Sequence, residues 1–308
     1  MNETRSYQIL DGFILKVLAM IFMSFDHIGV FLMLYGSNQM YPLPNFNNVG
    51  YIFRIIGRLS LPLFTFLLAE GMRHTHNKNK YLMKIGILFG LTLLSQITIA
   101  YGFKGMSSFG SNYNPIADLF FLSLVLYCLS LKGYRKLFAI LPIGYILGSY
   151  VVDIYEKVNA VNIYVFPIYL RAGYSIFNLL IGLGFYYATP LAVRLAHKTN
   201  QSLGISDEMF LDLPNGRKLI NIISSSILFF VTLIFWGISY IGVRSNGVSP
   251  YDPFSMGIES YCLLSIIFIY LYNGKRGYDS KWWRIFSYSY FPVHLIIIFI
   301  LFYVIMGY

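Results

Sequence analysis

The stretch FILKVLAMIFMSFDHIGVFLMLY, residues Phe13–Tyr35, decides the fold class of this chain. A run of about 20 predominantly apolar residues is long enough for a helix to cross the hydrocarbon core of a bilayer. Asp26 and His27 lie in the middle of this run. Ionisable side chains inside a membrane are costly to bury and usually mark a functional site. The stretch therefore predicts a membrane span that carries a candidate site.

The composition agrees with a membrane protein. The 308 residues are 57% hydrophobic and 12% charged, with a mean hydropathy of +0.62. Soluble domains are roughly 25% charged. The net charge of +10 does not indicate nucleic-acid binding, because the basic residues cluster in short loops between apolar runs. The two cysteines, Cys128 and Cys262, lack metal-ligand spacing, so we expect neither a disulfide framework nor a metal site.

We expect an all-α, polytopic membrane helix bundle in which residues 1–308 form a single integral membrane domain. About nine transmembrane helices are predicted, at Phe13–Tyr35, Asn48–Gly71, Tyr81–Tyr101, Pro115–Leu131, Tyr134–Val152, Gly173–His197, Leu219–Gly242, Gly257–Tyr272 and Ile285–Gly307. The first run is too long for a signal peptide, so we interpret it as a retained span. The apolar stretch Val161–Leu170 is too short to cross and predicts a re-entrant or interfacial segment.

The loop charges predict the orientation. If the N-terminus is cytoplasmic, inside segments hold 17 of the 23 basic residues. Outside segments hold four: Lys104, Lys157, Arg171 and Arg244. This asymmetry favours an N-in, C-out arrangement with nine crossings, because cytoplasmic loops are enriched in Lys and Arg.

Two arginines in the second predicted span, Arg54 and Arg58, lie at the depth of the Asp-His pair. With a rise of 1.5 Å per residue, Asp26 lies about 13 Å below the outer end of its helix, and the arginines lie about 9 and 15 Å below theirs. Asp26 and His27 point about 100° apart, which disfavours a simple dyad. We expect Asp26 to pair with an arginine while His27 faces a cavity, or the reverse. The alternative is a buried ion pair that only joins two helices.

Further polar residues are candidates for a larger site. A possible landing zone for a polyanionic cytoplasmic ligand follows the second span at Glu70, Arg73, His74, Lys78 and Lys80. Its alternative is a positive-inside anchor with a solvated Glu70. The remaining candidates are buried polar residues in other spans, namely Ser95, Gln96, Asp118 and His294. For His294, a catalytic role and an interhelical hydrogen bond are equally open. Glu259, near the start of the eighth span, receives no role.

Several of these segments together resemble the TraX family. The similarity lies in Met23–Gly29 (MSFDHIG), Phe53–Phe64 (FRIIGRLSLPLF), Glu70–Tyr81, Ser95–Gln96 and Tyr290–Leu295 (YFPVHL). The resemblance implies a polytopic inner-membrane acetyltransferase that uses acetyl-coenzyme A. The family's named example acetylates the N-terminus of conjugative pilin, and relatives can modify other acceptors. The chain departs from the family pattern at Asp118–Phe121 and after Tyr155. The resemblance therefore does not define the acceptor pocket.

The expected function is therefore acetyl transfer in a bacterial cytoplasmic membrane, to a peptide or glycan acceptor. His27 would act as general base or transient acetyl carrier, and Asp26 would orient Arg58 or a histidine. One arginine would polarise the thioester carbonyl, and coenzyme A phosphates would lie near Arg73, Lys78 or Lys80. A proton-coupled transporter is the second interpretation, and a non-enzymatic assembly factor is the third.

Overall fold

The computed structural model describes residues 7–36, 46–102, 113–246 and 256–305. Within these ranges the chain forms helices and connecting segments, with no β-strand. The α-helices are α1 (Gly12–Gly36), α2 (Phe46–Gly57), α3 (Ser60–His74), α4 (Lys78–Gly102), α5 (Pro115–Leu129), α6 (Ile140–Asn159), α7 (Ser175–Ser202), α8 (Asp207–Asp212), α9 (Pro214–Asn246), α10 (Met256–Glu259), α11 (Ile266–Tyr270) and α12 (Lys281–Ile305). Three 3-10 helices connect them: η2 (Gly133–Ala139), η3 (Ile168–Leu170) and η4 (Ser260–Ser265).

In the described part of the chain, seven helical stretches are long and apolar enough to cross a membrane. They coincide with seven of the nine predicted spans. The other two predicted spans correspond to the shorter apolar helices Pro115–Leu129 and Met256–Tyr270. The chain is therefore a multi-pass membrane protein, and the count of nine crossings stays a prediction.

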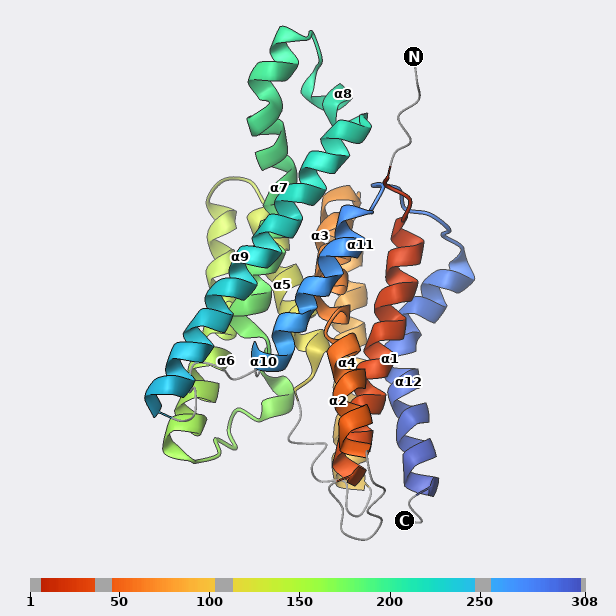
Figure 1. The fold of residues 1–308 in the computed structure, drawn as a ribbon, viewed down its shortest axis with the longest axis vertical. Helices are drawn as coiled ribbons and strands as arrows, with labels where there is room; N and C mark the ends of the chain where they lie inside the picture. The colour runs from red at the N-terminus through yellow and green to blue at the C-terminus, as the bar shows by residue number, and fades with distance from the viewer. Residues whose placement is uncertain (1–6, 37–45, 103–112, 247–255, 306–308) are drawn as a thin grey trace.

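The start of α1 and the end of α12 lie at opposite ends of the bundle, as an odd number of crossings requires (Figure 1). The N-in, C-out orientation stays a prediction. Lys104, the side chain of Arg244 and the predicted last span residue Gly307 lie outside the described residues. Arg171, counted above with the charges of the outside segments, is buried, with 1% exposure.

The second predicted span is not one continuous helix. It is divided into α2 and α3, and Arg58 and Leu59 lie in the turn between them. Pro62 gives the local reason. Its ring has no N–H to donate to the Arg58 carbonyl and would collide with that carbonyl in a straight helix.

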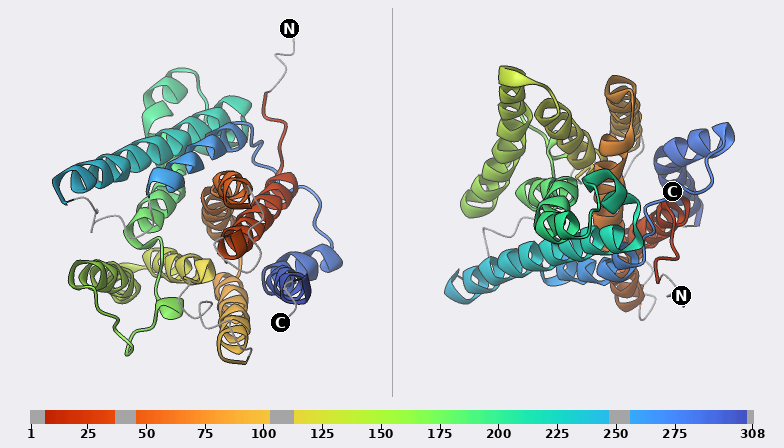
Figure 2. Two further views of the ribbon diagram at one scale, coloured as in Figure 1. Left: turned by 60° about the horizontal axis from the view of Figure 1, so that its bottom comes forward. Right: turned by 90° about the horizontal axis from the view of Figure 1, so that it is seen from above.

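Helix α3 occupies the middle of the bundle and packs against α1, α5 and α7 (Figure 2). Its Phe66 side chain is fully buried in a core cluster with Phe177 and Phe185. Helix α12 lies at the edge, against α1 and α4. Its outer face exposes apolar side chains such as Ile297 and Leu301, as expected where the surrounding solvent is hydrocarbon.

Candidate functional site

The break in the second span places Arg58 at the centre of a buried ion-pair network. Arg58 Nη2 donates to Asp26 Oδ1 on α1. Arg58 Nη1 donates to Glu259 Oε2 at 3.0 Å and to the Tyr174 hydroxyl at 2.8 Å. Arg58 is 5% exposed and Glu259 is fully buried. The predicted pairing of Asp26 with an arginine is therefore present, although the catalytic role of either residue stays a prediction.

Arg54 completes the charge balance of this network. Its Nε lies 3.7 Å from Asp26 Oδ1, too far for a hydrogen bond, and its side chain is 30% exposed. Two arginines therefore balance the two carboxylates of Asp26 and Glu259. The buried Nε of Arg54 makes no hydrogen bond to any described residue.

His27 lies beside His294 on α12. His27 Nδ1 is 2.7 Å from His294 Nε2, and the two rings stack at a centroid distance of 4.9 Å. His294 is 7% exposed. Asp26 and His27 therefore bind different helices, which agrees with the predicted 100° separation. The expectation that His27 faces a cavity stays a prediction, and the sequence did not indicate His294 as its partner.

The hydrogen bonds of the two rings define their tautomers. His294 Nδ1 lies 2.8 Å from the Tyr290 carbonyl oxygen, which can only accept, so this nitrogen carries a proton. In a neutral His294, Nε2 is then an acceptor, and His27 Nδ1 must be the donor to it. The remaining nitrogen, His27 Nε2, carries a lone pair. The hydrogen bonds between His27 and the described residues do not involve this nitrogen. A base oriented by a second group is the arrangement that proton abstraction needs.

The predicted ligand-landing zone begins at a buried carboxylate, and its role in binding a ligand stays a prediction. Glu70 is 4% exposed rather than solvated. It forms ion pairs with Arg73 and with Arg217 at 2.9 Å, and His74 Nε2 lies 3.6 Å from its Oε2. Arg217 also lies over the Tyr272 ring, 4.4 Å from its centroid. Glu70 therefore connects α3 to α9 through an ion pair and compensates the arginines, at a position where hydropathy predicts the membrane boundary.

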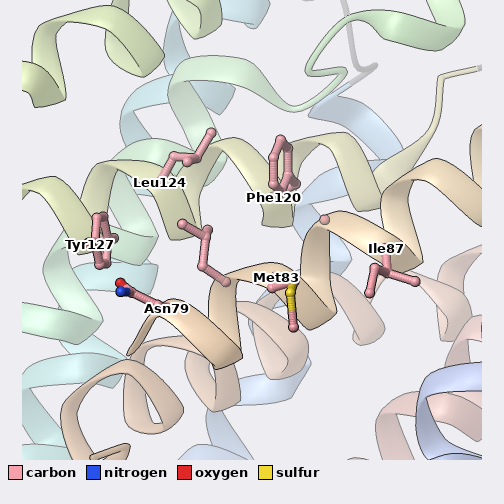
Figure 3. Close-up of a pocket in the computed structure, with 8 residues that line it drawn as sticks. Asn79, Met83, Ile87, Phe120, Leu124 and Tyr127 are labelled. Atoms are coloured by element: carbon pink, nitrogen blue, oxygen red, sulfur yellow. The ribbon is translucent and has the colours of Figure 1, made fainter. Parts of the chain in front are cut away.

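Asn79, the residue between Lys78 and Lys80 in the sequence, lines an open groove between α4 and α5 (Figure 3). The groove has a volume of about 550 Å³. Its lining is mainly apolar, with Asn79 and Tyr127 as polar exceptions at one end. No described carboxylate forms an ion pair with either lysine. The two lysines thus remain able to meet an anion, and the groove itself suits a hydrocarbon chain.

The remaining predicted candidates have local roles. Ser95 and Gln96 are half-buried rather than buried, and Ser95 donates to the Leu91 carbonyl of its own helix. Asp118 is 2% exposed and accepts the backbone N–H groups of residues 173, 174 and 175, at 2.9, 3.0 and 2.9 Å. Asp118 therefore caps the turn that leads into α7, whose first residue is Ser175. A substrate role for these three residues stays a prediction.

Sequence reasoning missed the roles of three residues in two buried polar clusters. Glu259 gave the same signal as Asp26, a carboxylate in an apolar run, but its partner was not evident. Tyr174 gave none, because tyrosines are common at span ends. Arg171 was counted as a loop charge, yet it binds Asp153 at 2.9 Å and Glu156 at 2.5 Å. This second buried cluster ties α6 to the segment before α7.

Comparison with known proteins identifies the family. The sequence model described as TraX protein matches residues 11–191, more than half of the chain. The chain belongs to the TraX family. The match includes Asp26, His27 and both arginines, whereas Glu259 and His294 lie beyond it.

One curated relative gives additional context. The chain is 38% identical over 81 residues to a protein described as "Probable fimbrial assembly protein FimC, serogroup H1" from Dichelobacter nodosus. The match covers 26% of this chain and 29% of that protein, so it spans less than a third of the relative. No solved structure matches the chain significantly.

Proposed function

We propose that this TraX-family chain is an acetyltransferase of the bacterial cytoplasmic membrane, which moves an acetyl group from cytoplasmic acetyl-coenzyme A to an acceptor at the membrane. The observation that carries the proposal is the lone pair of His27 Nε2, oriented by His294 and free of described partners. Family membership supports the same reaction, because the TraX resemblance implies acetyl transfer.

The chemistry needs one proton acceptor. His27 Nε2 takes the proton of the acceptor amine or hydroxyl while the acceptor atom attacks the thioester carbonyl carbon. When the tetrahedral intermediate collapses, the C–S bond breaks and the His27 imidazolium returns its proton to the thiolate of coenzyme A. If His27 instead carries the acetyl group transiently, the same lone pair forms the bond to carbon, and a single-turnover reaction leaves label on the protein.

Arg54 is the better candidate to polarise the carbonyl. The guanidinium of Arg58 is occupied by Asp26, Glu259 and the Tyr174 hydroxyl. The Arg54 side chain is less buried, and its Nε makes no hydrogen bond to the described residues. Asp26 then acts by orienting Arg58. Donors aimed at the developing oxyanion are usually the largest single contribution to catalysis.

Acetyl-coenzyme A would bind from the cytoplasmic side. Its phosphates would meet Lys78 and Lys80, with Arg73 nearby but partly compensated by Glu70. The acceptor is a peptide N-terminus, such as that of a pilin, or a cell-surface glycan. The fimbrial-assembly description of the relative favours the peptide acceptor.

The test is transfer of radiolabelled acetyl groups from acetyl-coenzyme A in native-host membranes that contain the folded chain. We expect label on a peptide, glycan or lipid, its loss in His27→Ala, and its retention in His197→Ala, which changes an exposed histidine. Equal labelling in all three samples, or no labelling above background, would reject the acetyltransferase.

A proton-coupled transporter is the second candidate. The observation that favours it is the broken second span, which holds Arg58 between Asp26 and Glu259 inside the membrane. In that case proteoliposomes would show substrate-dependent proton movement that Glu259→Gln abolishes, and acetyl-coenzyme A would have no effect on it.

A further inference from the structure

A second polar bridge joins α1 to α12, one helical turn before the histidine pair. Tyr290 Oη lies 2.7 Å from Ser24 Oγ. Ser24 Oγ donates its single proton to the Met20 carbonyl at 3.1 Å, so the Tyr290 hydroxyl is the donor to Ser24. Neither the Ser24 nor the Tyr290 side chain has a role in the chemistry described above.

Tyr290 also touches His294 in two ways. Its ring stacks on the imidazole of His294 with a centroid distance of 5.0 Å and an interplanar angle of 9°. Its backbone carbonyl accepts the proton of His294 Nδ1 at 2.8 Å. The position of Tyr290 therefore sets both the plane and the tautomer of His294, and through His294 the tautomer of His27.

In a membrane, these two bridges are important for the position of α12 along and around α1. The outer face of α12 exposes apolar side chains, including Val293 and Ile297. Sliding or rotating such a helix in lipid changes little hydrophobic free energy, because lipid tails are as apolar as the helix. Interhelical hydrogen bonds then decide how α12 sits on α1. The bridges at Ser24–Tyr290 and His27–His294 connect the same two helices about one turn apart.

We propose that Tyr290, held by Ser24, is a positioning residue for the His27–His294 pair, an inference that rests on the proposed acetyl transfer. The Tyr290 hydroxyl anchors α12 to α1, and the Tyr290 ring and carbonyl hold His294 so that His27 presents Nε2 as the acceptor. Tyr290 itself takes no part in bond making.

The test compares Tyr290→Phe, which keeps the ring and removes the hydroxyl, with Ser24→Ala and the double variant. We expect kcat to fall about three- to tenfold in each single variant, with the KM for acetyl-coenzyme A unchanged, because one hydrogen bond is lost. The double variant should fall no further than either single variant, because both remove the same bond. Ser289→Ala is the matched control, since the Ser289 hydroxyl donates to the Phe286 carbonyl of its own helix.

A second measurement reports the state of the His27–His294 pair independently of enzymatic activity. Nitrogen-15 NMR of histidine-labelled protein in lipid nanodiscs should show one His27 tautomer, protonated at Nδ1, in wild type and Ser289→Ala. Tyr290→Phe and Ser24→Ala should show a mixture of tautomers. The proposal requires both changes, so an unchanged tautomer or an unchanged kcat overturns it. If wild-type protein transfers no acetyl group, the proposed function fails, and the NMR result alone decides whether Tyr290 positions the pair.

Discussion

At the scale of single residues, carboxylates with the same sequence signal have different roles. Asp26 and Asp118 both lie in apolar runs. Asp26 binds an arginine, whereas Asp118 accepts three backbone N–H groups at the start of α7. The difference comes from the neighbouring element. A helix N-terminus provides unpaired donors, and a helix break provides room for a guanidinium.

Replacement of Asp118 should destabilise the fold rather than change chemistry. Asp118→Ala leaves three N–H groups without their acceptor, and we expect a loss of about 3 kcal/mol in unfolding free energy. Asp118→Asn should lose less, because its amide oxygen still accepts. Thermal unfolding in detergent measures both, with the exposed Asp207→Asn as a control. An Asp118→Ala protein as stable as wild type would refute the capping role.

Removal of the Arg58 charge alone should lower the free energy of unfolding more than removal of the charges of Arg58, Asp26 and Glu259 together. Arg58→Leu leaves Asp26 and Glu259 buried with little compensation, at an expected cost of about 3–5 kcal/mol. Adding Asp26→Asn and Glu259→Gln should restore part of that stability, because the stranded charges disappear. Thermal unfolding of the single and triple variants measures this difference. Equal midpoints would contradict the prediction that the triple variant is more stable.

At the scale of elements, the break between α2 and α3 creates the ion-pair site. Pro62 prevents a continuous helix, and Gly57 lets α2 approach α1 closely. A Cβ at Gly57 would lie 2.6 Å from Asp26 Cα and 2.8 Å from Asp26 N. The close approach brings the arginine side chains within reach of Asp26.

Gly57→Ala should therefore push α2 away from α1 and weaken the Asp26 ion pair. We expect a loss of about 1–3 kcal/mol, typical of overpacking against backbone. Gly90→Ala on α4 is the control, since its Cβ would meet nothing within 4 Å. Thermal unfolding of the two variants checks this, and equal stability would show that α2 can move at no cost.

At the scale of the whole molecule, the two ends of the bundle differ in charge. The exposed lysines Lys80, Lys132 and Lys198 lie in segments predicted to be cytoplasmic. The opposite end exposes uncharged residues such as Tyr164 and Val165, beside the exposed Lys157. The positive-inside rule then predicts which end faces the cytoplasm.

Cysteine labelling tests this orientation. The native Cys128 and Cys262 are buried and should react little. A membrane-impermeant maleimide added to intact cells should label Val165→Cys, because the native Val165 side chain is 96% exposed. Ser202 is also exposed, at the end predicted to be cytoplasmic. The maleimide should label Ser202→Cys only after the membrane is permeabilised. The reverse pattern would invert the topology.

The sequence by itself determined the properties that depend on local hydropathy. Apolar runs predicted the seven long helices, and spacing along two of them predicted that Asp26 meets an arginine. Tertiary structure alone decided which helix each polar side chain faces: His27 toward His294, Glu70 toward Arg217, and Arg58 toward Glu259. The physical reason is that hydropathy reports how favourably a segment enters lipid, whereas lipid is the same on every side of a helix. The rotation and register of each helix follow from hydrogen bonds and packing with neighbours that lie far away in the chain.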